Sequence, residues 1–512
     1  MKNILLVLTL IFLYSCNDDN DIPKIADRYI PEEVVKDEIN PVINLSAQFI
    51  NVNNDALVTW LNPEDKHLSK IEISYRLKDA PESSNTSIQI DALPSVVCRD
   101  TIKIPAGDDY IVSLVAINEI GARSEARITD IGAFYDPKDI PLFLNMADTL
   151  MTSVIKLYFG GKYDAWNSSY PNVNGPYWDG IAAVWGQGSA FSGYTNIREA
   201  SLNSAIEQKY TNYDDRFLYS INKFRNKKGG RAEAYGTYIG DNDERFYDDN
   251  VWIGIDMVNL YEQTGKKEYL DNAEMVWRFL LQGTDNIMGG GIYWKEDSQS
   301  KHTCSTAPAA VMAARLYLQT NDESYLKSAK ELYSWCKTVL QDPSDYLYWD
   351  NARLNDPNDP NSGLQVETSK YSYNSGQPMQ AAALLYKITK DPQYLTDAQN
   401  IAEASYNRFF KDYYSAALGQ NFKIVESSHV WFNAILFRGF VELYKIDNNN
   451  KYVTSYAKTM QHVWKTSRNT NTNLLNEDYC DGNGQSSWDI LQQGAFVEIL
   501  SVLGQLERQG LL

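Results

Sequence analysis

From residue 141 to the C-terminus, apolar residues recur at three- and four-residue intervals, a pattern that predicts amphipathic helices. In the segment that begins at Lys267, the apolar positions fall on one stripe, formed by Tyr269, Leu270, Ala273, Val276, Trp277 and Leu280. Segments of this kind predict twelve helices, near residues 141–159, 181–198, 213–226, 249–263, 267–282, 305–319, 323–340, 373–389, 391–410, 429–446, 450–467 and 487–508.

The predicted helices form a repeat of hairpins. In four places a Leu-Tyr pair, beginning at Leu260, Leu316, Leu385 and Leu443, is followed by a second tyrosine at a constant offset. Each unit therefore predicts the end of one helix, a short turn and the start of the next helix. The units lie farther apart than the roughly 34 residues of a tetratricopeptide repeat. Six hairpins of unequal spacing predict an all-α domain with the fold of a closed (α/α)6 toroid.

The connections between the predicted helices are of two kinds. Short turns at 264–266, 320–322, 390 and 447–449 alternate with long connections at 160–180, 227–248, 283–304, 341–372, 411–428 and 468–486. In an up-and-down array, every second connection lies at the same end. We therefore expect all the long connections to share one face, where function usually resides.

Residues 41–133 carry a different pattern. Alternating or continuous apolar runs at 56–60, 70–76 and 110–118, separated by turn residues, predict the strands of a small all-β sandwich. Residues 109–121 resemble the late strands of a fibronectin type III domain. Prolines between residues 134 and 141 mark the boundary with the helical domain, which we place at 141–512.

The N-terminus resembles the signal of a bacterial lipoprotein. Lys2 precedes an apolar run, 4–14, that is too short to span a bilayer, and the run ends in Leu13-Tyr14-Ser15-Cys16. We therefore expect a signal peptide at 1–15, lipidation of Cys16 and an acidic tether at 16–40. This arrangement predicts anchoring to a bacterial outer membrane, with the protein either surface-exposed or periplasmic. We expect a monomer.

Charge and composition narrow the ligand class. A net charge of −19 argues against nucleic acid and against polyanionic glycans, and 35 Tyr and 12 Trp favour a neutral polysaccharide or oligosaccharide. Four histidines, and cysteines without metal-site spacing, predict no metal and no cofactor. The sequence does not assign a disulfide among Cys98, Cys304, Cys336 and Cys480.

The long connections and the helix starts beside them are rich in side chains that suit sugar binding. Flat rings with a polar edge stack on sugar rings, and amide or imidazole groups bind hydroxyls. The candidate substrate-binding residues are Tyr247, Asn250, Trp252, Trp178, Tyr293, Trp294, Trp349, Tyr373, Asn374 and His429. The glycines of 289–291 are expected to let the backbone approach a ligand closely.

Asp248 and Asp249 are the candidate catalytic residues. Two carboxyl groups that flank a scissile bond are what glycoside hydrolysis requires. Adjacent Cα atoms lie about 3.8 Å apart, so neighbouring side chains reach the roughly 5 Å separation of retaining enzymes more readily than the wider separation of inverting ones. Two close carboxylates also resist joint ionisation, which keeps one of them protonated. Helix capping is the competing explanation of the pair.

A family resemblance favours catalysis. Residues from about 141 to 510 resemble the catalytic domain of glycoside hydrolase family 76, the α-1,6-mannanases. The motifs that carry the resemblance are Tyr247-Asp248-Asp249-Asn250-Val251-Trp252, Gly289-Gly290-Gly291-Ile292-Tyr293-Trp294, Tyr373-Asn374-Ser375-Gly376-Gln377, Trp431-Phe432-Asn433 and Phe437-Arg438-Gly439. The resemblance implies an (α/α)6 fold and retaining, endo-acting hydrolysis of the α-1,6-mannan backbone, with Asp248 as nucleophile and Asp249 as acid/base.

Other interpretations stay open at this point. The stretch 302–306 departs from the lysine–asparagine-like pattern expected there, which puts the local sugar contacts in doubt. A non-catalytic glycan-binding lipoprotein of a polysaccharide-capture system is the main alternative. A third class comprises other toroid enzymes, such as unsaturated uronyl hydrolases or sugar epimerases. The net negative charge of the chain disfavours the uronyl hydrolases, and its small number of histidines disfavours the epimerases.

Overall fold

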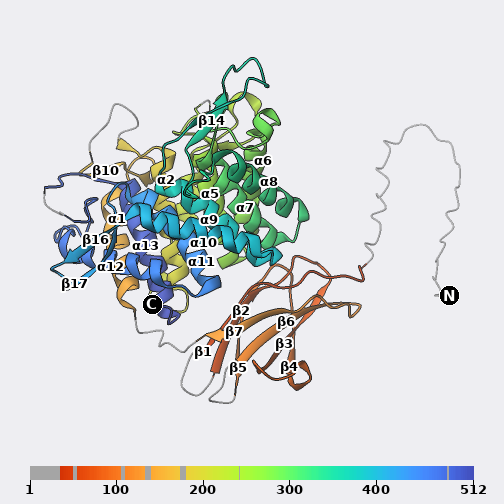
Figure 1. The fold of residues 1–512 in the computed structure, drawn as a ribbon. Helices are drawn as coiled ribbons and strands as arrows, with labels where there is room; N and C mark the ends of the chain where they lie inside the picture. Colours follow the sequence, from red (N-terminus) through yellow and green to blue (C-terminus); the bar gives the residue numbers. More distant parts are fainter. Residues whose placement is uncertain are drawn as a thin grey trace, which may run out of the picture.

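The structure is a computed structural model of the 512-residue chain. It describes residues 35–49, 55–104, 110–132, 140–172, 180–241, 243–480 and 484–512. Figure 1 shows a region of strands near the N-terminus and a larger mass of helices. A helix with the length and apolarity to cross a membrane is not found among these residues.

The helical part contains all twelve predicted helices in the described chain. They are α1 (Leu142–Tyr158), α2 (Val184–Ser201), α4 (Asp214–Asn222), α5 (Tyr247–Thr264), α6 (Lys267–Gln282), α7 (Thr303–Thr320), α8 (Glu323–Leu340), α9 (Ser372–Thr389), α10 (Pro392–Phe409), α11 (Val430–Asp447), α12 (Lys451–Thr466) and α13 (Ile490–Arg508). The pattern did not predict the short helix α3 (Glu207–Thr211). The helix predicted at 213–226 ends four residues early, at Asn222, because a short strand follows it.

Six helices form an inner set whose contacts make a closed circuit. Helix α2 packs on α5, α5 on α7, α7 on α9, α9 on α11, α11 on α13, and α13 packs back on α2. The outer helices α1, α6, α8 and α10 each pack mainly against one inner helix. Helix α6 packs on α5, α8 on α7 and α10 on α9, whereas α1 packs on α13. The inner helices are buried nearly all round, whereas the outer ones are amphipathic, as their sequence period requires.

The circuit closes where α2 meets α13. A Cβ on Gly494 would lie 2.5 Å from the backbone oxygen of Ser189, so the two helix backbones are nearly in contact. The Ser189 hydroxyl donates to the Leu491 carbonyl at 2.6 Å. Nearby, Glu507 of α13 accepts from the first-turn amide of Phe143 in α1 at 3.0 Å. The end of the chain therefore completes the packing of its first two helices.

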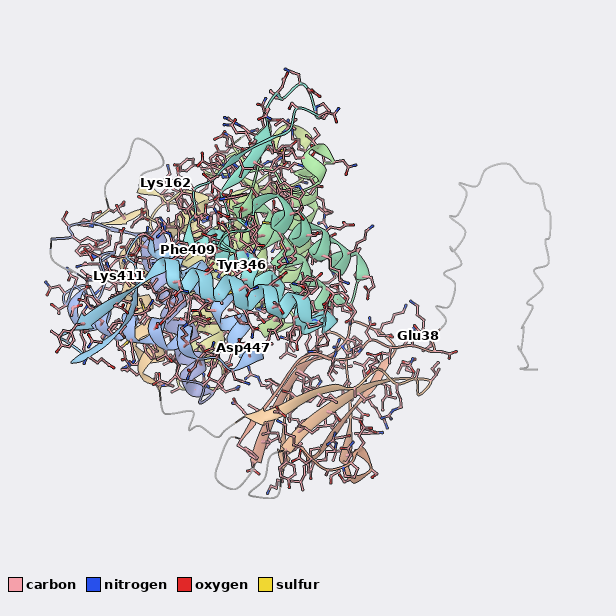
Figure 2. All side chains as sticks on the ribbon, in the orientation of Figure 1. Glu38, Lys162, Tyr346, Phe409, Lys411 and Asp447 are labelled. Atoms are coloured by element: carbon pink, nitrogen blue, oxygen red, sulfur yellow. The ribbon has the colours of Figure 1, made fainter. Side chains whose placement is uncertain are left out.

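All six inner helices run in the same direction. Residues from their first turns meet at one end, where the candidate site lies. Residues from their C-terminal halves, including Glu199, Glu262, Arg315, Lys387 and Lys445, line a cavity of about 190 Å³ at the other end. The long connections therefore lie together at the N-terminal end of the inner helices, as predicted. In Figure 2, Lys162 of one long connection lies far from Asp447, which ends α11 near the strands.

The Leu-Tyr repeat marks four left-handed turns. Gly265, Asn321, Lys390 and Asn448 have φ between 55° and 65°, and each donates its amide to the carbonyl of the tyrosine four residues earlier. This αL ending satisfies a carbonyl that the helix leaves free and reverses the chain into the next helix. The four turns share this geometry, which explains why the Leu-Tyr pattern recurs in the sequence.

Short strands occur in the long connections. They are β8 (Phe159–Gly160), β9 (Ala165–Trp166), β10 (Ser169–Tyr170), β11 (Arg225–Asn226), β12 (Ala234–Tyr235), β13 (Ser300–His302), β14 (Asn351–Leu354), β15 (Leu364–Glu367), β16 (Phe410–Ser415), β17 (Gln420–Val425) and β18 (Trp488–Asp489). Strands β13, β14 and β15 form one antiparallel sheet that joins two of these connections.

The N-terminal region is built of strands, as predicted. They are β1 (Ile43–Phe49), β2 (Asp55–Leu61), β3 (Leu68–Leu77), β4 (Thr86–Asp91), β5 (Val97–Lys103), β6 (Tyr110–Asn118) and β7 (Arg127–Gly132), hydrogen-bonded in the order β4-β3-β6-β7-β1-β2-β5. Pairing is antiparallel except between β1 and β7. Both halves of this sheet share one core, to which Trp60, Ile73 and Leu114 belong.

The strand region packs against the end of the helical part where the short turns lie. Leu61 belongs to the main hydrophobic cluster of the helices. The Asn44 side chain donates to the Glu262 carbonyl in the last turn of α5 at 2.8 Å. Arg127 donates to Asn321, the residue that ends α7, at 3.2 Å. The strands therefore cover the end of α5 opposite its first turn (Figure 1).

We predict that Gly265→Ala weakens this contact. Gly265 has φ of 65°, and a Cβ there would lie 2.5 Å from Leu61 and 2.9 Å from Val97. The left-handed backbone costs about 1 kcal/mol for alanine, and the overlap adds about 1–3 kcal/mol. Gly419→Ala is the control, because Gly419 has φ of 67° but open space around it. Chemical denaturation should show the larger loss for Gly265→Ala, and equal losses would contradict the packing explanation.

Candidate active site

Asp248 and Asp249 lie in the first turn of α5, at the end of the inner helices where the long connections meet. Phe246 precedes the helix in the capping position, and no side chain caps it. The Asp248 carboxylate instead accepts from the amide of Asp249 at 2.9 Å. The pair is therefore not there to cap the helix, although the positive end of the helix dipole favours its negative charge.

Three donors surround the Asp248 carboxylate. Besides the Asp249 amide on Oδ1, the indole of Trp294 donates to Oδ2 at 3.0 Å, and the thiol of Cys304 donates to the same oxygen at 3.5 Å. Burial raises the pKa of Asp248 to about 6, and these three hydrogen bonds limit the rise. Asp248 is therefore held as a carboxylate above about pH 6.

Asp249 has the opposite character. Burial, and then the negative charge of Asp248, raise the pKa of Asp249 well above its usual value. In the described structure its carboxyl group receives no hydrogen bond comparable to those on Asp248. The two adjacent carboxyl groups therefore divide into a hydrogen-bonded carboxylate and a protonated acid, the division that general acid catalysis requires.

The connection before α7 delivers Trp294 to the pair. The Tyr247 amide donates to the Trp294 carbonyl at 2.9 Å, so backbone pairing sets the indole beside Asp248. Trp294 is 38% exposed, and its ring stacks on His302 at 5.4 Å between centroids. Burial lowers the pKa of His302 to about 4, so the imidazole is neutral at neutral pH. An exposed indole face beside the carboxylate is suited to a sugar ring.

A buried ion pair holds these connections together. The Arg245 guanidinium is fully buried and donates to both oxygens of Glu296, at 3.0 and 2.6 Å. It also donates to the Ala232 carbonyl at 2.7 Å. Because Arg245 lies just before α5 and Glu296 just after Trp294, the pair ties three chain segments around the carboxylates. A bidentate, buried pair fixes geometry more than it adds stability.

The floor of the site is aromatic. Trp431, in the first turn of α11, is buried and makes edge-to-face contacts with Trp252 at 5.1 Å and with Trp185 at 5.4 Å. Trp185, in the first turn of α2, is 37% exposed and stacks parallel to His429 at 5.8 Å. Burial lowers the pKa of His429 to about 4, so this imidazole is neutral as well.

The wall between α9 and α11 continues this surface. The ring of Phe432 lies 4.2 Å from His429 and 4.2 Å from Tyr373, measured between centroids. Burial, followed by Cys304 and the carboxylates Asp350 and Asp248, raises the pKa of the Tyr373 hydroxyl. The Tyr373 hydroxyl is therefore close enough to Asp248 to be influenced by its charge.

Three of the expected sugar contacts prove to be packing residues. Tyr247 is buried and stacks on Phe279 at 4.6 Å. Trp252 is buried under Trp431. The Asn250 amide is fully buried and is occupied by the backbone of Tyr235 in both directions, at 2.8 and 2.9 Å. We correct the prediction for these three, since residues three apart share one face of a helix, and Tyr247 and Asn250 both turn toward the core.

The expectation for Tyr293 and the preceding glycines is also corrected. The Tyr293 hydroxyl donates to Asp285 at 2.9 Å, within a loop that Lys301 holds by donating to Asp285 at 2.6 Å. A Cβ on Gly291 would overlap the Trp335 ring at 2.6 Å. Gly290 and Gly291 therefore make room for a tryptophan of α8, whereas Gly289 has open space beside it.

The remaining predicted site residues do not share one environment. Asn374 is buried and donates to Asp350 at 3.0 Å, so it orients that carboxylate and has little surface for a sugar. Trp349 is half-buried, and its carbonyl accepts from Thr303 at the start of α7 at 2.6 Å. Trp178 and Cys16 lie outside the described residues. Of the predicted set, Trp294 donates to Asp248 and Tyr373 interacts with its charge, whereas His429 belongs to the aromatic surface around Trp185 and Phe432.

Sequence reasoning missed Trp185, Phe432, Asp350 and Cys304 as site residues. Trp185, Cys304 and Phe432 stand in the first turns of inner helices, where other candidates were chosen, whereas Asp350 lies in a long connection just before β14. Asp214-Asp215, a second adjacent pair at a helix start, is structural, because Asp214 binds Arg198 at 2.6 Å. The described part of the chain holds no cluster of three metal-ligating side chains.

The sequence profile of glycosyl hydrolase family 76 matches residues 143–509. The chain belongs to glycoside hydrolase family 76. A crystal structure of a family 76 enzyme from a bovine Bacteroides thetaiotaomicron strain is 39% identical, with a TM-score of 0.69 over 92% of this chain and all of that one. A family 76 mannosidase from B. thetaiotaomicron VPI-5482 is 45% identical, with a TM-score of 0.71 over 72% of this chain and all of that one.

More distant proteins share the family fold. The mannan endo-1,6-α-mannosidase DFG5 of Candida albicans is 25% identical over 56% of this chain and 61% of its own length. The chain spans about half to three fifths of the length of such curated relatives. An inactive α-1,6-mannanase variant from Salegentibacter, with two consecutive aspartates changed to alanine, was solved with α-1,6-mannotetraose; it is 22% identical, with a TM-score of 0.58 over 72% of this chain and all of that one.

We predict that Asp249→Asn stabilises the protein at pH 8 and not at pH 4. The raised pKa of Asp249 means that the folded state holds a proton that the unfolded state releases above about pH 4. The free energy of unfolding therefore falls as the pH rises through the folded-state pKa. Asparagine removes this loss, so the melting temperature at pH 8 should rise by a few degrees.

Asp215→Asn is the control for this prediction, because Asp215 also follows an aspartate at a helix start but has a side chain that is 96% exposed. Its melting temperature should match that of the wild type at both pH values. A pH-independent effect of Asp249→Asn would show that charge burial is not the cause.

Proposed function

We propose that this protein is a retaining, endo-acting glycoside hydrolase that cleaves α-1,6-mannosidic bonds in the backbone of mannan. The observation that carries the proposal is the division of one adjacent aspartate pair into a carboxylate with three donors and a protonated acid. Membership of family 76 and the similarity to mannan endo-1,6-α-mannosidases support the substrate class. The inactive Salegentibacter variant supports the importance of two consecutive aspartates in this fold.

The proposed reaction has two displacements. Asp249 gives its proton to the glycosidic oxygen while an Asp248 oxygen attacks the anomeric carbon, so the glycosidic bond breaks and a mannosyl ester forms. Asp249, now a carboxylate, removes a proton from water, and the water oxygen displaces Asp248 from the anomeric carbon. The second inversion restores the α configuration, and the pair returns to its starting protonation.

The aromatic surface suits a neutral substrate. Trp294 lies on the α7 side of the pair, whereas Trp185 lies on the α2 side, so exposed indole faces flank α5 in the order of the inner helices. Each indole stacks with a histidine that is neutral at neutral pH, His302 or His429. Neutral imidazoles both donate and accept hydrogen bonds, as sugar hydroxyls require.

We further propose the finer architecture and location. The closed circuit of inner helices supports an (α/α)6 toroid at 141–512. The shared core of the seven strands supports a fibronectin type III-like sandwich at 41–133 that serves as a support. Together with a signal peptide at 1–15, a lipidated Cys16 and a tether at 16–40, this describes a monomer anchored to a bacterial outer membrane.

We predict that Asp248→Ala and Asp249→Ala each lose most activity on linear α-1,6-mannan. Loss of the acid/base costs about 10²–10⁴-fold, and loss of the nucleophile leaves only background. Chromatography of products over time measures both, and circular dichroism verifies the fold. Binding of mannan by the wild type without products would instead favour the glycan-binding alternative.

We predict that azide separates the two roles. With an aryl α-1,6-mannobioside, azide should enter the space left in Asp249→Ala and attack the ester intermediate, which gives an α-configured glycosyl azide. In Asp248→Ala, azide replaces the nucleophile in a single displacement and gives the β-configured product. Proton NMR of the anomeric signals distinguishes them, and the reverse pattern would exchange the two assignments.

We predict that Cys16→Ala releases the protein from membranes. Without the thiol no acyl chain can be attached, and no helix among the described residues has the length and apolarity to cross a membrane. When cells that express the full chain are fractionated, the Cys16→Ala protein should be found in the soluble fraction instead of the membrane pellet. Cys98→Ala is the control and should stay in the pellet.

A further inference from the structure

We propose that Cys304 is a positioning residue for the nucleophile, whose thiol donates a hydrogen bond that holds the Asp248 carboxylate in its orientation for attack. This inference rests on the proposed function, because it assigns a further part to the same site. It concerns a residue in the stretch 302–306, where the sequence departs from the pattern expected of the family.

The geometry places the thiol on the carboxylate. Cys304 is the second residue of α7 and is only 5% exposed. Its Sγ lies 3.5 Å from Asp248 Oδ2, within the reach of a sulfur hydrogen bond. An ionised carboxylate only accepts hydrogen bonds, so the thiol is the donor. The contact joins α7 to the first turn of α5 at the catalytic pair.

The thiol adds a third donor to the Asp248 carboxylate. A carboxylate offers about four acceptor positions. The Asp249 amide, the Trp294 indole and Cys304 occupy three of them. Because a thiol is a weak donor, it restricts rotation of the carboxylate while withdrawing less electron density from Oδ2 than a hydroxyl or an ammonium group would. The hydrogen bond from Cys304 therefore orients the Asp248 carboxylate with little loss of its nucleophilicity.

The environment keeps the sulfur protonated. Burial, and then the negative charges of Asp248 and Asp350, raise the pKa of Cys304 well above its usual value. The thiol therefore remains a donor throughout the pH range in which Asp248 is ionised. Cys304 also lies beside the Tyr373 hydroxyl, so its position links the nucleophile to the aromatic wall.

A second cysteine provides a matched comparison. Cys336 of α8 is fully buried and unpaired like Cys304, and the two lie on neighbouring helices. Its polar neighbour is the Thr303 hydroxyl and not a carboxylate. Truncation of either cysteine to alanine removes a similar volume from the core, so a difference between the two variants reports the contact with Asp248.

The first test is the pH dependence of kcat/KM on α-1,6-manno-oligosaccharides. Loss of the donor in Cys304→Ala destabilises the Asp248 carboxylate, so the acidic limb should move up by about 0.5–1 pH unit. We expect kcat to fall about tenfold and KM to change less than about twofold, since orientation acts on the reacting step. Cys304→Ser keeps a donor and should recover most of kcat.

Cys336→Ala should keep the wild-type kcat, and the acidic limb of its pH profile should stay at the wild-type position. If Cys304→Ala and Cys336→Ala have the same pH profile, or if Cys304→Ser is as impaired as Cys304→Ala with no movement of the limb, Cys304 is a packing residue and the proposal is overturned. Melting temperatures of all variants verify that each is folded under the assay conditions.

The second test needs no substrate. Carbon-13 NMR of protein labelled at the aspartate carboxyl carbons follows the titration of Asp248, which is assigned by the signal that Asp248→Asn removes. The midpoint should rise in Cys304→Ala and not in Cys336→Ala. If the wild type releases no mannan products while this shift is present, the proposed function fails and the hydrogen bond stands. Activity on mannan without the shift overturns the role of Cys304 alone.

Discussion

Two neighbouring carboxyl groups resist carrying charge together at half-buried positions, and the surroundings of α5 reflect this constraint. Desolvation alone would protonate both groups. The protein supplies donors to Asp248 and leaves Asp249 without comparable help, so the same burial yields two different chemical species. Asymmetric hydrogen bonding, more than the identity of the residues, therefore separates the two carboxyl groups.

That asymmetry depends on parts of the chain that are distant in sequence. The donors on Asp248 come from its own helix, from the connection before α7 and from the first turn of α7. Arg245 and Glu296 fix two of these segments relative to each other. At its other end, α5 is covered by the strand region through Asn44 and Leu61. The helix that bears the pair is thus held along its whole length.

The sequence allowed the helices, the grouping of the long connections and the position of the aspartate pair to be predicted, because hydrophobic period and turn chemistry are local. Which aromatic residues face the site could not be predicted. Trp252 and Trp185 both stand near a helix start, yet Trp431 covers the first and leaves part of the second exposed. That distinction depends on helix rotation and on partners far along the chain, as does the contact of Cys304 with Asp248.

The joint between α2 and α13 has a consequence for biogenesis. The apolar faces of α1 and α2 are made early in synthesis, but their partner occupies the last twenty or so residues of the chain. Contacts of such large sequence separation form slowly, because a long loop must close before they form. The emerging chain therefore carries incompletely packed apolar helices until α13 has been made, and a chain that stops short of α13 retains them as an aggregation-prone intermediate.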